Sequence, residues 1–155
     1  MQIHSIMPNI KEQLYNLCIV YVQNRMQAAE DAFRAAEQAQ NDDTKSSAGD
    51  KYETGRAMMQ QEKDRNTIQL NEANKLMVAL NTVGTNPSTI AETGSVVITD
   101  NGSFYIAISA GKLSVDEAEY FAVSPSSPVG LKMKGLKAGD GFEVNGKKYR
   151  ILEIQ

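Results

Sequence analysis

Apolar side chains recur at alternating steps of four and three residues through the first forty positions of the chain. Between residues 9 and 40 there is no proline and no glycine. The recurring positions are Tyr15, Ile19, Val22, Met26, Ala29, Phe33 and Ala36. This spacing places them on one narrow stripe of a helix, with mostly polar residues elsewhere. The pattern predicts a long helix over residues 9–40 that packs against one partner helix.

A second helix is predicted over residues 50–82, again without proline. Its apolar stripe is less regular and runs through Tyr52, Met59, Asn66, Leu70, Ala73, Met77 and Leu80. Each helix would be about 48 Å long at the usual helical rise. The connection over residues 41–49 is short, so the second helix must fold back along the first. We therefore predict an antiparallel coiled-coil hairpin over residues 1–82, with an acidic tip near residues 41–53.

The rest of the chain changes from a helical period to strand alternation. Residues 83–93, "VGTNPSTIAET", have the composition of a linker. In residues 94–155, two Asn-Gly pairs lie between β-prone runs and predict two hairpins. The pairs are Asn101-Gly102 and Asn145-Gly146. A further strand is predicted over residues 119–125, and a short helix is predicted to begin near Pro128. The fold class is thus α+β, a helical hairpin followed by a small β-rich domain.

Composition and charge narrow the possible functions. The chain has 155 residues, of which 41% are hydrophobic, 23% are charged and 6% are aromatic, with no Trp. These values predict a polar chain with too few large apolar side chains for one large core. The formal net charge is −3, and from Gly94 onward seven basic and seven acidic residues balance. The basic excess that drives direct nucleic-acid binding is therefore missing.

The single cysteine and the single histidine limit the available chemistry. Cys18 cannot form an internal disulfide, and its place between stripe positions of the first helix favours a packing role. His4 cannot supply a His-rich metal site. Residues 1–13 have neither a basic segment nor an apolar run long enough for a signal peptide or a membrane span. We expect a cytoplasmic protein with no membrane partner.

Four acidic residues gather around the predicted tip: Asp42, Asp43, Asp50 and Glu53. Asp50 and Glu53 are three residues apart at the start of the second helix, which puts both on nearly one face. One interpretation is a helix cap, because acids in a first turn stabilise a helix. The other is a Mg²⁺ site, because this ion takes only one or two protein carboxylates and keeps several waters. Asp42 and Asp43 either assist as accessory tip acids or are simply solvated.

Two stretches of the sequence resemble the Gre family of bacterial transcript-cleavage factors. Residues 126–154, "SSPVGLKMKGLKAGDGFEVNGKKYRILEI", are similar to the family's carboxy-terminal pattern of Ser-Pro-hydrophobic-Gly, a Gly-Asp turn and a final hairpin. The matching residues are Ser127, Pro128, Val129, Gly130, Gly135, Gly139 and Asp140. The second stretch, "GDKYE" at residues 49–53, is similar to the family's tip motif of Gly-Asp, two variable residues and Glu. Where the family continues with Asn, this chain has Thr54.

The resemblance implies a transcription elongation factor that binds RNA polymerase. Its carboxy-terminal domain would be FKBP-like and would grip the rim of the secondary channel, while the hairpin enters the channel and stimulates cleavage of backtracked RNA. The implied partner-binding residues are Ser127, Pro128, Val129 and Gly130. Asp50 and Glu53 would be the catalytic pair, holding a Mg²⁺ shared with the polymerase and orienting a water.

The same resemblance limits what the chain would do alone. It would hold no metal stably and would not be a stand-alone enzyme, because the polymerase supplies the other metal and the RNA. It would meet nucleic acid only through the polymerase complex. We expect a monomer.

Three other interpretations stay open. Thr54 and the unusual residues 41–48 are compatible with a Gre-like factor that binds polymerase and regulates or inhibits it without stimulating cleavage. The hairpin is also compatible with a self-associating coiled coil. The aromatic residues of the β-rich domain either form its core or line a pocket of a peptidyl-prolyl isomerase. These residues are Phe104, Tyr105, Tyr120, Phe121, Phe142 and Tyr149.

Overall fold

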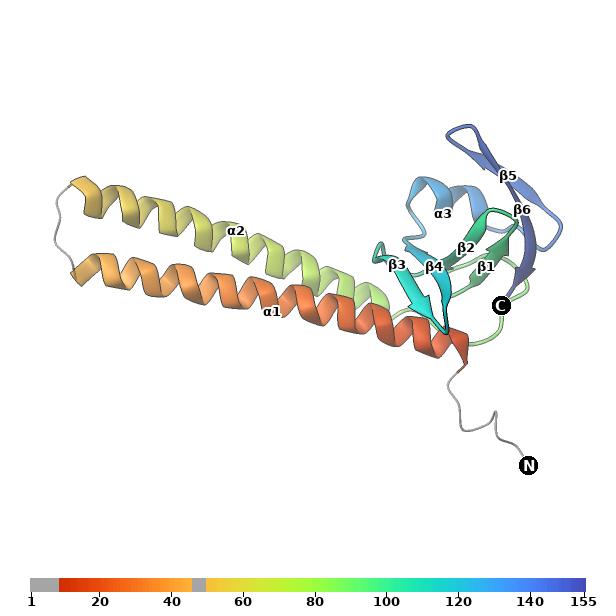
Figure 1. Ribbon diagram of the computed structural model, residues 1–155, viewed down its shortest axis with the longest axis horizontal. Helices are drawn as coiled ribbons and strands as arrows, with labels where there is room; N and C mark the ends of the chain where they lie inside the picture. Colours follow the sequence, from red (N-terminus) through yellow and green to blue (C-terminus); the bar gives the residue numbers. More distant parts are fainter. Residues whose placement is uncertain (1–8, 46–49) are drawn as a thin grey trace, which may run out of the picture. The chain divides into compact units, whose positions relative to one another are not determined.

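A computed structural model describes the backbone of residues 9–45 and 50–155, and their side chains except those of residues 43–45 and 50–53 (Figure 1). The elements are α1 (Ile10–Lys45), α2 (Asp50–Leu80), β1 (Val96–Thr99), β2 (Gly102–Ile106), β3 (Gly111–Val115), β4 (Ala118–Val123), α3 (Pro128–Met133), β5 (Gly141–Val144) and β6 (Lys147–Ile154). The predicted α+β class is confirmed. The chain forms two compact units, one of Tyr21–Met77 and one of Met1–Val20 with Val78–Gln155.

Helix α1 is longer than the sequence pattern predicts. It begins after Asn9, whose side-chain oxygen accepts a hydrogen bond from the Glu12 N–H at 2.8 Å and so caps the helix. It then continues past Gln40 to Lys45. Asp42 and Asp43 therefore belong to the helix, which corrects their predicted place in the turn. Asn, Asp and Thr are weak helix formers, but residues 9–45 contain no Gly or Pro.

Helix α2 ends at Leu80, two residues before the predicted end. The N–H groups of Asn81, Thr82 and Val83 then bond to carbonyls three residues earlier, at 3.0–3.2 Å, so the helix closes with a tightened turn. Within the part of the chain that the structure describes, no helix is both long and apolar enough to cross a membrane.

Within the unit Tyr21–Met77, the two helices lie antiparallel (Figure 1). Arg25 donates to the Gln69 side chain at 3.5 Å, and Gln40 donates to the Gln60 side chain at 3.5 Å. The residue number thus falls along α2 as it rises along α1. The buried residues of this seam are Val22, Ala29, Ala36, Asn66 and Ala73, all of them predicted stripe positions. Because three are alanines, the helices can approach closely.

The first turns of α1 bury a different set of residues from the predicted stripe. Leu14 and Cys18 are fully buried, whereas Tyr15 and Ile19 are only half-buried. These turns belong to the same compact unit as the sheet. Burial raises the pKa of Tyr105 on β2, and the nearby Cys18 and Tyr15 raise it further. The sheet therefore selects the buried face here, and Cys18 lies in the packing surface rather than between stripe positions.

The six strands form one mixed sheet in the order β3-β4-β2-β1-β6-β5. Strands β2 and β4 are parallel, and the other neighbours are antiparallel. Asn145 and Gly146 have φ of 52° and 81° and form the predicted two-residue turn between β5 and β6. At the first hairpin Thr99 pairs with Gly102, so the loop residues are Asp100 and Asn101 instead of the predicted Asn101-Gly102.

Strand β3 was absent from the sequence-based prediction. It pairs with β4 through a turn at Asp116 and Glu117, whose φ values of 50° and 68° are both positive. Such turns favour Asn and Gly, and this one contains neither. The hairpin therefore has no turn signal in the sequence, although β3 itself alternates buried and exposed residues.

Both faces of the central strands are covered. On one face Val97, Phe104, Ile106 and Ile151 form a core with Met133 of α3 and Ala91. On the other face Val96 and its cross-strand partner Tyr105 are fully buried. Strands apolar on both faces need two covering layers. Helix α3 contributes to one of these layers, and the first turns of α1 contribute to the other.

A register shift between β1 and β6 changes which side chains of β6 share a face. Strict alternation predicts Ile151 and Ile154 on opposite faces. The pairing changes from Ile98 with Glu153 to Thr99 with Ile151, which leaves Leu152 without a partner. This bulge turns both isoleucines toward the same core, while Leu152 is exposed.

The segment between α2 and β1 is tied to the rest of its unit at several points. The buried Lys11 ammonium donates to the Asn86 carbonyl, and burial lowers the pKa of Lys11 despite the nearby Glu92 carboxylate. Gly94 has φ of 95°, and a Cβ added there would lie 2.7 Å from the Gly84 carbonyl oxygen. This close backbone approach requires glycine at residue 94.

Replacing Gly94 by alanine should therefore destabilise the protein by about 2–4 kcal/mol, through overpacking and left-handed backbone strain. Gly84→Ala is the matched control, because a Cβ at Gly84 meets nothing within 4 Å. Urea unfolding curves of both variants measure the difference. Equal stability of the two variants would contradict the close approach.

Burial raises the pKa of the Cys18 thiol to about 11. The thiolate is the reactive form, so native protein should react very slowly with iodoacetamide at neutral pH and faster as the pH rises toward 11. Mass spectrometry of the alkylated protein follows the reaction, and unfolded protein in guanidinium chloride serves as the fully reactive control. Rapid alkylation of the native protein at neutral pH would show that the thiol is accessible.

Candidate functional site

The predicted acidic tip lies where α1 ends and α2 begins. Asp50 is the first residue of α2, and Glu53 lies in its first turn. Asp42 is exposed near the end of α1. Gly49 and the side chains of Asp43, Asp50 and Glu53 lie outside the described residues, so their roles stay predictions. Among the described side chains, no group of three or more His, Cys, Asp and Glu residues could hold a metal ion.

A cluster of polar contacts joins the two helices next to this tip. The Lys63 ammonium on α2 donates to the Gln40 side chain at 3.2 Å, lies 4.0 Å from the Glu37 carboxylate and sits 5.4 Å from the centre of the Phe33 ring. Gln40 also donates to the Arg56 carbonyl at 3.3 Å. The Lys63 side chain is only 18% exposed, so these contacts are better shielded than an ordinary surface ion pair. They hold the ends of α1 and α2 in one register.

Asn66 is a buried polar residue at the centre of the seam. It is 7% exposed, and its Nδ2 has no hydrogen-bond partner among the residues that the structure describes. It borders a cavity of about 340 Å³ that Phe33 and Leu70 also line. A buried amide without a partner lowers stability. In coiled coils such an Asn commonly fixes the register and the oligomeric state.

The motif at residues 127–130 forms the start of α3. Ser127 is the N-cap, and its hydroxyl accepts from the Gly130 N–H at 3.1 Å while donating to the Ser124 carbonyl at 2.7 Å. Pro128 follows as the first helical residue, where no N–H is needed. Pro128 is exposed, Val129 packs against the core, and Gly130 is buried. Of the predicted partner-binding residues, Pro128 is thus the most accessible.

Gly130 fixes how closely α3 approaches the loop before it. A Cβ at this position would lie 2.3 Å from the Ser124 carbonyl oxygen and 3.0 Å from the Ser127 hydroxyl. Any side chain here would push α3 away from Ser124 and Pro125. Close packing of α3 against this loop therefore explains the glycine of the Ser-Pro-Val-Gly motif without reference to a partner.

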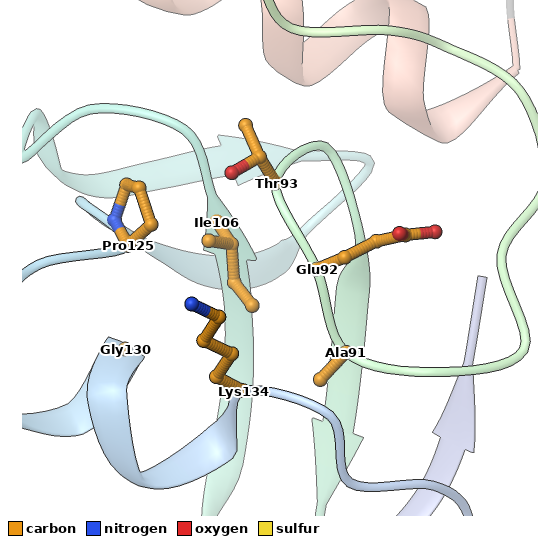
Figure 2. Close-up of a pocket in the computed structure, with 7 residues that line it drawn as sticks. All are labelled: Ala91, Glu92, Thr93, Ile106, Pro125, Gly130 and Lys134. Carbon is orange, nitrogen blue, oxygen red and sulfur yellow. The ribbon is translucent and has the colours of Figure 1, made fainter.

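A cavity of about 310 Å³ lies beside α3 (Figure 2). It is lined by Ala91, Glu92, Thr93, Ile106, Pro125, Gly130 and Lys134. Two backbone hydrogen bonds hold its walls together, from the Ala91 N–H to the Leu136 carbonyl at 2.7 Å and from the Gly135 N–H to the Ala91 carbonyl at 2.8 Å. None of the lining residues is aromatic, whereas Tyr149 contacts both Phe104 and Phe142 elsewhere in the domain.

The two charged residues of the cavity differ in their surroundings. Glu92 accepts a hydrogen bond from the Ser88 hydroxyl at 2.9 Å and lies near Lys11. In Figure 2 its carboxylate is directed away from Lys134, whose side chain extends toward Pro125 and Ile106. The cavity wall contributed by residues 91–93 falls in the predicted linker, so sequence reasoning missed it. The apolar pair Ile90-Ala91 between polar residues was the available signal.

Several solved structures are similar to this chain, and two of them are structures of Gfh1. No protein-family model and no curated protein matches the sequence. GreA factor homolog 1 (Gfh1) of Thermus thermophilus is 19% identical, with 86% of this chain and 92% of that chain covered and a TM-score of 0.34. A structure of the transcription factor Gfh1 is 17% identical, with 91% and 92% covered and a TM-score of 0.34. By name Gfh1 is a homolog of GreA, a member of the family that the sequence resembles.

Substituting leucine for Asn66 should stabilise the hairpin by about 1–3 kcal/mol, because it removes an unpaired buried amide. The cost should be lost specificity, seen as self-association in light scattering. Asn74→Leu is the matched control on an exposed position of the same helix and should change stability by less than about 0.5 kcal/mol. Destabilisation by Asn66→Leu would mean that the amide has a partner in solution.

Proposed function

We propose that this protein is a Gre-like transcription elongation factor that binds RNA polymerase and stimulates cleavage of backtracked RNA. One observation carries the proposal: the "GDKYE" motif lies where α1 gives way to α2, with Asp50 as the first residue of α2. A carboxylate pair at the turn of a helical hairpin can act inside another protein's active site. The resemblance of residues 126–154 to the carboxy-terminal pattern of the Gre family supports the same partner.

The dimensions of the hairpin suit entry into a narrow channel. The part of α1 within the unit Tyr21–Met77 covers residues 21–45, about 37 Å at 1.5 Å per residue. Two packed helices, each about 10 Å across, give a cross-section of about 20 by 10 Å. Alanines at three buried seam positions let the two helices pack closely, which keeps the hairpin narrow. The contacts of Lys63 near the tip limit splaying of the helix ends.

The donor groups at the tip suit Mg²⁺ shared with the polymerase. Asp50 and Glu53 are three residues apart on the backbone of α2, a spacing that suits an ion taking one or two protein carboxylates. When bound, the ion would stabilise charge on the attacked phosphate. The two carboxylates would bind it and orient a water. Alone, two carboxylates hold Mg²⁺ weakly, so the isolated protein should not cleave RNA.

The β-rich domain would supply the binding energy for the complex. In this proposal it is FKBP-like, and the residues around Ser127 and Pro128 meet the rim of the polymerase's secondary channel. The factor would act as a monomer in the cytoplasm and would approach RNA only inside the complex. The cavity beside α3 has no aromatic lining, so it does not favour the isomerase alternative.

The double variant Asp50→Asn/Glu53→Gln should lose stimulation of transcript cleavage, because amides are poor Mg²⁺ ligands. Its cleavage rate on stalled, backtracked complexes should fall to that of polymerase alone, while its affinity for polymerase stays within about twofold of wild type. Asp42→Asn is the matched tip control and should retain most of the stimulation. The assay follows shortening of labelled RNA on a gel.

Two results would contradict this proposal. RNA cleavage by the purified protein with Mg²⁺ and no polymerase would make it a nuclease. Wild-type protein that binds polymerase without stimulating cleavage would instead make it a regulator or inhibitor, the alternative that Thr54 leaves open.

A further inference from the structure

We propose that the cavity beside α3 receives an acidic side chain of the partner protein, with the Lys134 ammonium as its charged contact. This inference rests on the proposed function, since the partner is taken to be RNA polymerase. It adds Lys134 as a binding residue and requires an acidic group on the partner. Neither follows from the motif at residues 127–130. Lys134 lies outside the four motif residues and takes its place in the cavity from the fold.

The charge around the cavity favours an acidic partner. From Tyr120 to Gly139 the chain contains three lysines and no acidic residue. The one acidic residue that lines the cavity, Glu92, accepts from Ser88 and lies near the buried Lys11. The Lys134 ammonium points into the cavity and has no carboxylate partner among the described side chains (Figure 2). A carboxylate entering here would meet an available positive charge.

The size and the lining of the cavity suit a side chain rather than a cofactor. Its volume of about 310 Å³ is at the lower end of the range for ligand pockets, about 300–1,000 Å³. Ile106, Pro125 and Ala91 provide apolar wall, against which the methylene groups of Asp or Glu can pack. Long acidic side chains can thus bury their stems while the carboxylate reaches the ammonium.

The cavity is also preorganised. The Ala91 hydrogen bonds to Leu136 and Gly135 fix one wall, and the Ser127 cap with Gly130 fixes the other. Binding therefore needs to order little more than the Lys134 side chain.

The test compares Lys134→Met and Lys134→Glu with Lys132→Met in binding to RNA polymerase core enzyme. Met keeps the apolar stem of lysine and removes its charge, and Lys132 is an exposed neighbour that does not line the cavity. Fluorescently labelled proteins are titrated with core enzyme at low and at high salt. Lys134→Met should weaken binding about tenfold at low salt and Lys134→Glu further, because charge complementarity is lost. Both variants should bind with less dependence on salt than wild type, and Lys132→Met should stay within about twofold of it.

Other results separate this inference from the proposed function. If wild type binds core enzyme and neither Lys134 variant binds it more weakly, the inference is wrong and the proposed function stands. Wild-type protein that does not bind core enzyme overturns the proposed function, and the inference with it. Binding of short single-stranded RNA in the absence of polymerase, if lost in Lys134→Met, would assign Lys134 to phosphate and overturn the carboxylate assignment. Thermal unfolding of each variant should match wild type, because Lys134 is exposed.

Discussion

Burial of both faces of the central strands is the constraint on which the β-rich domain depends. Val96 and Tyr105 point to one face, and Val97 and Phe104 to the other, and all four are buried. Because each face needs its own cover, the domain recruits α3 on one side and the first turns of α1 on the other. The beginning of the chain thus becomes part of a core built mainly from its second half. The same demand explains why Cys18, and not the neighbouring Ile19, is fully buried in α1.

The helical hairpin is stabilised by different interactions from those of the β-rich domain. Three of its five buried seam residues are alanines and a fourth is Asn66, whose Nδ2 has no partner among the described residues, so the fully buried positions contribute little apolar burial. Polar contacts between the helices, centred on Lys63 and Gln40, instead fix how the two helices are aligned near the tip. Polar seam groups stabilise little and define alignment well.

The short helix α3 shows how packing and binding can share residues. Its start is fixed by the Ser127 cap and by the contact that only glycine permits at residue 130. Val129 is used for the core. The accessible side chains are those of Pro128, Leu131, Lys132 and Lys134, and only the first of these belongs to the recognisable motif. The motif residues thus mainly fix the structure of α3, while neighbouring residues provide most of its exposed side chains.

The sequence alone determined the elements whose signal is local. Helical periodicity gave both long helices and most of the seam, the second Asn-Gly pair gave the last turn, and Ser127-Pro128 gave the start of α3. Tertiary structure decided what depends on distant partners. The turn at Asp116 and Glu117 adopts positive φ without glycine, the bulge at Leu152 turns Ile151 and Ile154 to one core, and the Ala91 hydrogen bonds form a cavity wall from an apparent linker. Local propensity carries no information about these contacts, because their free energy comes from residues that meet only when the sheet is assembled.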